Sequence, residues 1–237
     1  MEYVIKIKTT TNLPLQYSLN KENYENKQVT VAGWVKSARG GKAFGFLDVN
    51  DGSNFKGVQV VFDADKLANF DEVAKLNTGS SIVAEGTLIL TPEARQPFEV
   101  QATAVEVLSA TDAEYPLQKK KMTLEFLREQ AYLRPRTNTY SAVFRVRSEA
   151  SFALHQFFNN EGFVYLQAPI FTASDCEGAG ELFRVSTQDI YAGKKLNPED
   201  ELFGKSVFLS PSCQLEGESF ALGLGNIYTF GPTFRAE

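Results

Sequence analysis

Histidine and cysteine are scarce in this chain of 237 residues, which contains one His and two Cys. Zinc sites built from these residues need several of them at short spacings, and no such spacing occurs, so we predict no metal site in this chain. Cys176 and Cys213 provide no disulfide framework, so we expect free thiols in a reducing compartment, the cytoplasm. His155 lies between apolar neighbours and is expected to have a structural or surface role.

Long apolar runs and excess positive charge are also missing. No run approaches the length of a membrane span, and the N-terminus is too polar for a signal peptide, so no membrane partner is predicted. A net charge of −5 argues against a general basic coat for nucleic acid. A local basic region remains, either a binding patch or a solvated run of charge. Its members are Lys119, Lys120, Lys121, Arg134, Arg136, Arg145 and Arg147.

Hydrophobic residues make up 43% of the chain and charged residues 22%, so the chain can bury a core and is not disordered. Residues 1–27 are polar and form an N-terminal extension. Residues 28–108 contain five short β-rich runs, with a helical apolar spacing between the third and the fourth. That order is typical of the OB-fold, a five-stranded barrel that commonly binds oligonucleotides; another small β-barrel is the alternative. The apolar residues at this helical spacing are Leu67, Phe70, Val73 and Leu76.

Residues 109–138 are predicted to be a linker or hinge that contains one short helix. Thr123 is a plausible N-cap for it, and the helix should stop before Pro135, which disfavours helical backbone in the preceding residue. A longer helix is predicted over residues 139–160, with a C-cap at residues 159–162. Its apolar stripe comprises Val143, Val146, Ala150, Ala153 and Phe157.

The segment from Glu161 to Phe183 combines an apolar strand with a polar loop. Pro169 cannot donate to a sheet ladder, so it should lie at an edge or a break. Residues 174–181 are acidic and rich in glycine, which predicts a functional loop on a rigid support. Two further strand-like runs cover residues 206–210 and 226–234. Because the sequence stops just after the second run, we expect it to be incomplete.

Four segments, in this order, resemble blocks of the asparaginyl-tRNA synthetase family, which belongs to the aspartyl/asparaginyl/lysyl subgroup of class II aminoacyl-tRNA synthetases. The segments are AYLRPRTN (131–138), GFVYLQAPIFTASDCEGAGELFRVST (162–187), SCQLEGE (212–218) and IYTFGPTFRAE (227–237). The second is similar to class II motif 1 plus the loop that closes over the amino acid, and the fourth is similar to the first strand of motif 2.

This resemblance implies an all-β OB-fold anticodon-binding barrel followed by an α+β domain. The α+β part, residues 139–237, would be the first part of a class II catalytic domain, an antiparallel sheet with flanking helices. Motif 3 is absent, so the chain is expected to be inactive alone. The implied reaction is ATP-dependent activation of L-asparagine and transfer to tRNA(Asn). The implied assembly is a homodimer through the motif 1 region. Mg²⁺ is expected with ATP, with its ligands outside this chain.

The resemblance also assigns nucleotide-binding residues. Arg235 would meet the charge that develops on the α-phosphate of ATP, as both a catalytic and an ATP-binding residue. Glu237, two residues further along the expected strand, would accept a hydrogen bond from the adenine amino group. Without the resemblance, an exposed ion pair on a strand would be the favoured explanation for both residues.

Four residues would bind the amino acid. Glu177, on the loop, would hold the substrate ammonium, and Ser212 and Gln214 would contact the substrate at the pocket floor. Glu218 would accept from the amide of asparagine and repel the carboxylate of aspartate. The aspartate enzymes should have a lysine nearby, which QLEGE lacks. Pro211 and Cys213 depart from the Val and Gly that are usual in the family, and they affect how Ser212 and Gln214 are positioned.

The OB barrel should bind the anticodon, a single-stranded loop whose bases can be splayed onto aromatic rings. Phe46 matches a stacking phenylalanine of the related aspartyl family, and Gln59 matches its base-reading glutamine. Arg39, expected in the first inter-strand loop, is a candidate phosphate or base contact. The alternative for Phe46 is a place in the barrel core.

Three other functions remain open. An aspartate–tRNA ligase would use almost the same fold and would differ in which amino acid it activates. A non-catalytic fragment that only binds anticodon loops would need the barrel alone. A synthetase-like asparagine synthetase is disfavoured because it should lack the OB barrel.

Overall fold

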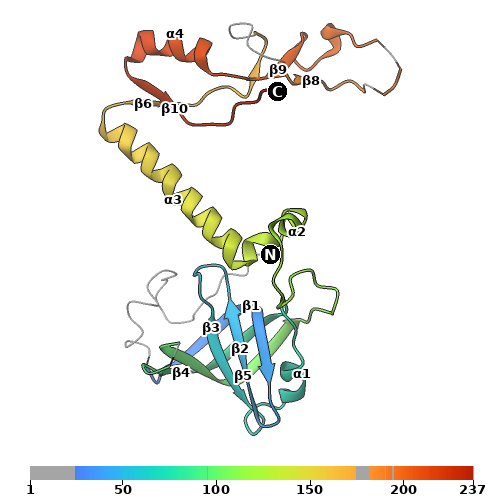
Figure 1. Ribbon diagram of the computed structural model, residues 1–237, viewed down its shortest axis with the longest axis vertical. Helices are drawn as coiled ribbons and strands as arrows, with labels where there is room; N and C mark the ends of the chain where they lie inside the picture. Colours follow the sequence, from blue (N-terminus) through green and yellow to red (C-terminus); the bar gives the residue numbers. More distant parts are fainter. Residues whose placement is uncertain (1–24, 95, 175–181, 190, 194, 237) are drawn as a thin grey trace. The chain divides into compact units, whose positions relative to one another are not determined.

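The computed structural model describes residues 25–94, 96–174, 182–189, 191–193 and 195–236. The chain divides into two compact units, with the division between Arg145 and Val146 (Figure 1). Each unit has its own secondary structure and is described separately. The predicted N-terminal extension falls almost wholly outside the described residues. Within the described ranges, no helix is both long and apolar enough to cross a membrane.

The first unit contains a closed five-stranded barrel with the strand order β1-β2-β3-β5-β4 (Figure 1). Its elements are β1 (Gln28–Gly40), β2 (Phe44–Asn50), β3 (Val58–Asp63), α1 (Phe70–Ala74), β4 (Ser81–Leu90) and β5 (Phe98–Ser109). β3 and β5 pair in parallel, and the other neighbouring strands are antiparallel. The predicted OB-fold order is therefore confirmed.

Alternating side chains of the strands fill the barrel, as the period of two requires. Leu47, Val49, Val60, Phe62 and Ile82 are fully buried. α1 is shorter than the predicted helical insert, but all four apolar residues of that spacing are buried, and the Phe62 and Phe70 rings lie 5.3 Å apart. The helix therefore closes one end of the core.

The segment after the barrel has a small core of its own. α2 (Leu124–Glu129) begins at Thr123, whose Oγ1 accepts from the Phe126 N–H at 3.2 Å, so the predicted N-cap is confirmed. The 3₁₀ turn η2 (Arg134–Arg136) contains Pro135. Leu117, Leu127 and Leu133 form the buried cluster.

Four of the predicted basic residues contact the first unit itself, one of them Lys119, whose Nζ donates to the Ala38 carbonyl of β1. Arg136 lies 4.8 Å from the ring of Trp34, and Arg134 lies 4.9 Å from the ring of Tyr140. Arg145 donates to the Gly52 carbonyl at 2.6 Å. The Arg136 contact joins the hinge to the barrel, the Arg134 contact joins the hinge to the helix that follows, and the Arg145 contact joins that helix to the barrel. An additional role in binding remains a prediction.

α3 (Asn138–Asn160) matches the long helix predicted from the sequence. Its C-terminal cap lies where it was predicted, because Gly162 has φ +80° and donates to the Asn159 carbonyl at 3.1 Å. The apolar stripe is not covered by the described residues, because Val146 is 68% exposed and Phe157 is 57% exposed.

The second unit contains two small sheets and a helix. β6 (Val164–Leu166) pairs in parallel with β10 (Ile227–Thr229). β7 (Phe171–Thr172), β9 (Val207–Leu209) and β8 (Arg184–Val185) form an antiparallel sheet in that order. The 3₁₀ turn η3 (Pro198–Asp200) and α4 (Gln214–Leu224) complete the unit. Pro169 lies between β6 and β7, so the predicted break is confirmed.

One strand prediction was wrong in its extent. The run 226–234 was expected to be a strand, but β10 ends at Thr229. Pro232 has no N–H to donate, and in the described structure the segment after β10 forms one backbone hydrogen bond to a neighbouring segment, from Phe234 to Ser210 at 3.0 Å. Arg235 therefore extends from an irregular segment and not from a strand.

His155 connects α3 to β10. Its Nδ1 lies 2.8 Å from the Tyr228 hydroxyl, and its ring packs edge-to-face against Tyr165 and Phe230. The expected structural role is confirmed. The side chain acts as a polar link within an aromatic cluster.

Candidate functional sites

The first candidate site is the outer face of β1, β2 and β3. The strand register pairs Arg39 with Phe46 and Asp48 with Gln59. Phe46 and Asp48 are two residues apart, so their side chains lie on the same face of the sheet. Phe46 is half-buried, and its ring lies 5.7 Å from the Arg39 guanidinium carbon. The three predicted anticodon residues Arg39, Phe46 and Gln59 are thus brought together by neighbouring strands.

Two details of this face differ from what the sequence indicated. Arg39 belongs to β1 and not to the loop after it, because the first hairpin turn begins only at Gly41. Gln59 has a partner that sequence analysis missed. Its Nε2 donates to Glu99 Oε2 at 3.0 Å, from the parallel strand β5. No pattern in one sequence indicates that these strands, 40 residues apart, are neighbours.

Asp48 adds a perturbed carboxyl group to this face. Burial raises the pKa of Asp48 above its ordinary value, and the charges of Lys36 and Arg39 oppose that shift only in part. Its Oδ1 is buried and has no hydrogen-bond partner within the described structure. The face therefore has an aromatic ring, a cation and an amide around a weakly solvated carboxyl group.

The second candidate site lies between β9 and the start of α4. Ser212 Oγ accepts from the Gln214 N–H at 3.1 Å, and Gln214 Nε2 donates to Glu218 Oε1 at 2.9 Å. Gln214 and Glu218 are four residues apart on α4, so their side chains meet on one exposed side of the helix. The structure thus brings together three of the four residues predicted to bind the amino acid.

Arg235 lies next to this cluster. Its Nε donates to the Pro211 carbonyl at 3.4 Å, and its side chain is exposed. The other two predicted residues, Glu177 and Glu237, lie outside the described residues.

Ser210 holds the two segments of the second site together, and sequence analysis did not identify it. The residue is buried, and its N–H donates to the Ile170 carbonyl at 2.8 Å. Its Oγ donates to the Ser212 carbonyl at 2.7 Å, and its own carbonyl accepts from the Phe234 N–H. A single serine therefore fixes Ser212 relative to the segment that carries Arg235.

The two departures from the family pattern fit into this arrangement. Pro211 is buried and contributes its carbonyl to Arg235, an interaction that needs no N–H at this residue. Cys213 Sγ donates to Thr229 Oγ1 at 3.1 Å and is a free thiol. Cys176, the other predicted free thiol, lies outside the described residues.

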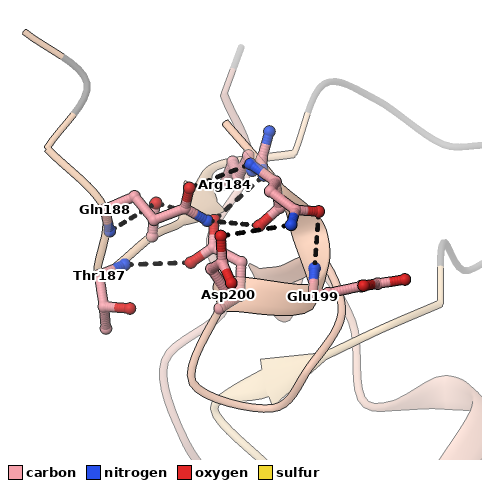
Figure 2. Close-up of polar contacts among 8 residues, drawn as sticks. Arg184, Thr187, Gln188, Glu199 and Asp200 are labelled. Atoms are coloured by element: carbon pink, nitrogen blue, oxygen red, sulfur yellow. Dashed lines mark hydrogen bonds and ion pairs between the residues drawn. The ribbon is translucent and has the colours of Figure 1, made fainter. Parts of the chain in front are cut away.

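A polar cluster holds the long connection between β8 and β9 (Figure 2). Glu201, 6% exposed, accepts from Arg184 Nη2 at 3.1 Å, from Ser186 Oγ at 2.8 Å and from the Thr187 N–H at 3.1 Å. Desolvation alone would raise the pKa of Glu201, but the hydrogen bonds of Ser186 and Thr187 and the charge of Arg184 together lower it below its ordinary value.

Metal ligands are not gathered at either site. Within the described ranges, no group of three or more His, Cys, Asp or Glu side chains is placed to hold an ion.

Two ranges of this chain match families of known proteins. Residues 29–108 match the family described as the OB-fold nucleic acid binding domain, and residues 123–237 match the class II tRNA synthetases (D, K and N). The first candidate site lies in the former range and the second in the latter. The chain therefore combines a region that matches OB-fold nucleic acid binding domains with a region that matches the class II tRNA synthetases (D, K and N).

Within that class, the chain is similar to asparagine–tRNA ligases. It is 53% identical to the enzyme of Alkaliphilus oremlandii and 52% identical to that of Clostridium perfringens, over 223 residues in each case. These matches cover 92% of this chain and 48% of each relative. The chain thus spans about half the length of these relatives.

Solved structures of asparaginyl-tRNA synthetases are also similar to this chain. Asparaginyl-tRNA synthetase from Pyrococcus horikoshii, complexed with asparaginyl-adenylate, is 26% identical, with a TM-score of 0.77 over 91% of this chain and 46% of that one. The asparaginyl-tRNA synthetase of Entamoeba histolytica shares the fold at 22% identity and a TM-score of 0.68, covering 90% of this chain and 46% of that one. The predicted OB barrel followed by a partial class II synthetase domain is confirmed.

Proposed function

We propose that the intact protein is an asparagine–tRNA ligase, to which this chain contributes the anticodon-binding barrel and part of the catalytic domain. The observation that carries the proposal is the Ser212–Gln214–Glu218 cluster beside Arg235, in a chain about half identical to asparagine–tRNA ligases. The reaction would take place in the cytoplasm, where ATP, asparagine and tRNA(Asn) are available.

In the first step, a carboxylate oxygen of asparagine attacks the α-phosphorus of ATP, and diphosphate leaves as the new bond forms. Negative charge develops on the α-phosphate oxygens, which the Arg235 guanidinium can meet with paired N–H donors. Its contact with the Pro211 carbonyl orients the side chain beside the amino-acid cluster. Glu237 would bind the adenine amino group. In the second step, a hydroxyl of the terminal tRNA ribose takes the acyl group, and AMP leaves.

Glu218 would select asparagine. It already accepts a hydrogen bond from the carboxamide of Gln214, which is the same chemical group as the asparagine side chain. Aspartate would bring a second carboxylate to this position, and the repulsion disfavours it. Ser212 and Gln214 would contact the substrate, and Glu177 would hold its ammonium group.

Mg²⁺ would enter with ATP and neutralise phosphate charge. The described residues offer no cluster that fits the ion, so none of them is assigned to it. The exposed apolar stripe of α3 supports a two-fold homodimer through the motif 1 region. The outer face of β1–β3 would bind the anticodon, with a base on Phe46 and Gln59 reading a base edge.

The test is amino-acid-dependent exchange of diphosphate into ATP, catalysed by the intact protein. We expect exchange with asparagine and far less with aspartate. Faster exchange with aspartate would instead identify an aspartate–tRNA ligase.

A non-catalytic role for this chain by itself is the second candidate. The closed barrel is complete in its described strands, whereas α3 has exposed apolar side chains. An isolated chain of this kind would bind anticodon loops and form no adenylate.

A further inference from the structure

Phe44 is an exposed aromatic residue on the candidate RNA face that the proposed function leaves without a role. Its side chain is 54% exposed at the start of β2. It is two residues from Phe46, so both rings lie on the outer face of the strand. The ring centroids are 5.6 Å apart, and the ring planes are nearly perpendicular, at 89°.

The backbone around Phe44 is held firmly. The Phe44 carbonyl accepts from the Gly41 N–H at 2.9 Å, which closes the hairpin between β1 and β2. On the other side, Phe44 pairs in register with Asp63 of β3. A ring on a fixed backbone loses little conformational entropy when a ligand covers it, which favours binding.

We propose that Phe44 is a second base-stacking platform, which holds the nucleotide next to the one on Phe46 when single-stranded RNA lies on this face. The inference rests on the proposed anticodon-binding function and deepens it. Phe46 alone would hold one base of the loop, whereas Phe44 and Phe46 together hold two successive bases.

The ring geometry specifies what kind of RNA fits. Residues two apart on a strand are about 6.6 Å apart, roughly twice the spacing of stacked bases. The perpendicular rings also require the two bases to lie in different planes. The ligand must therefore have two adjacent bases that do not stack on each other, as in a tightly turned loop. Lys42, exposed in the hairpin turn, and Arg39 provide positive charge for the phosphates at this end of the barrel.

Binding of the anticodon stem–loop of tRNA(Asn) to the 237-residue chain tests the proposal, measured by fluorescence anisotropy. Because stacking of one base contributes about 1–3 kcal/mol, Phe44→Leu should weaken binding about fivefold or more, whereas Phe44→Tyr should bind like the wild type. Phe55→Leu is the matched control, since Phe55 is also exposed, at 41%, but lies beyond the opposite end of β2. It should change affinity less than twofold.

Abasic substitutions in the loop identify the base. Removing the base that stacks on Phe44 should abolish the effect of Phe44→Leu, and this position should be adjacent to the one coupled to Phe46→Leu. Wild-type affinity of Phe44→Leu, or coupling of both variants to one base only, would overturn the inference and leave the proposed function standing. Failure of the wild-type chain to bind the stem–loop would overturn the proposed function, and the inference with it.

Discussion

In the proposed function, Glu218 is the single residue on which the choice of amino acid would depend most directly. Its carboxylate is exposed on α4 and accepts the Gln214 carboxamide. A negative charge at this position attracts an amide and repels a carboxylate, so this one side chain would both favour asparagine and disfavour aspartate.

Replacing Glu218 by Gln should therefore change selectivity. In the intact protein, we expect Glu218→Gln to slow diphosphate exchange with asparagine at least tenfold. The ratio of the exchange rate with asparagine to the rate with aspartate should also fall. Glu216→Gln, on the same helix, is the control and should preserve that ratio. An unchanged ratio in Glu218→Gln would remove Glu218 from the selection of the amino acid.

Ser210 is also a single residue, but it would act on the second site through the neighbours that it holds in place. Ser210→Ala removes the hydroxyl that donates to the Ser212 carbonyl. The loss of one buried hydrogen bond should lower the free energy of unfolding by about 1 kcal/mol, measurable by urea denaturation of the chain. In the intact protein, KM for asparagine should rise more than kcat falls, because Ser212 loses its position. Ser219→Ala, an exposed serine that bonds to Leu215, should change neither.

Among whole elements, the sequence predicted those whose signals are local. Alternation identified the barrel strands, and Thr123 and Gly162 fixed helix ends because their caps involve residues three or four positions away. Elements that depend on distant partners were less predictable. β10 ends at Thr229, six residues before Arg235, because continuation of a strand requires a hydrogen-bonding neighbour for each further residue. The contact of Gln59 with Glu99 depends on the pairing of β3 with β5.

The residues of the candidate sites were likewise predictable only where their signal is local in the sequence. Ser212, Gln214 and Glu218 lie within seven residues, so their family pattern was visible in one segment. The role of Ser210 could not be predicted from the sequence, because it depends on hydrogen bonds that join three separate segments of the chain. Phe44 was missed because neither its exposure nor the angle between its ring and Phe46 follows from an alternating pattern.

The connection from β8 to β9 should respond to pH through Glu201. The folded pKa of Glu201 is lowered, so its stabilising effect is complete above the ordinary pKa of a glutamate, about 4.3, and is lost as the pH falls through the lower folded value. We expect Glu201→Gln to lower the Tm of the chain at pH 7 and to differ less from the wild type as the pH drops below about 4.3. Thermal unfolding followed by circular dichroism measures this.

Glu199→Gln is the matched control for that experiment. Glu199 is exposed in the neighbouring turn η3, and its side chain points away from the cluster in Figure 2. The Tm of Glu199→Gln should equal that of the wild type at every pH. A constant difference between Glu201→Gln and the wild type from pH 7 to pH 3 would contradict the proposed role of the Glu201 charge.

At the scale of the whole molecule, the chain combines a closed barrel with a unit whose helix α3 has exposed apolar side chains. Binding of an anticodon loop requires only the barrel, whereas adenylate formation requires residues that surround ATP. The two activities should therefore be separable in this chain.

We expect the 237-residue chain to bind the tRNA(Asn) anticodon stem–loop but to show negligible asparagine-dependent diphosphate exchange. Filter binding and exchange assays on one preparation measure both activities, with the intact protein as the positive control for exchange. Robust exchange by the chain would mean that Arg235 and the cluster around Gln214 suffice for adenylate formation.

The positions of Trp34 and His155 have a practical consequence for spectroscopy. The chain contains one tryptophan, beneath Arg136 in the first unit, and one histidine, hydrogen-bonded to Tyr228 in the second. Indole fluorescence therefore reports on the barrel unit alone, and the imidazole proton resonances report on the other unit alone. Each unit can be followed through unfolding or RNA titration in the unlabelled, unmutated protein.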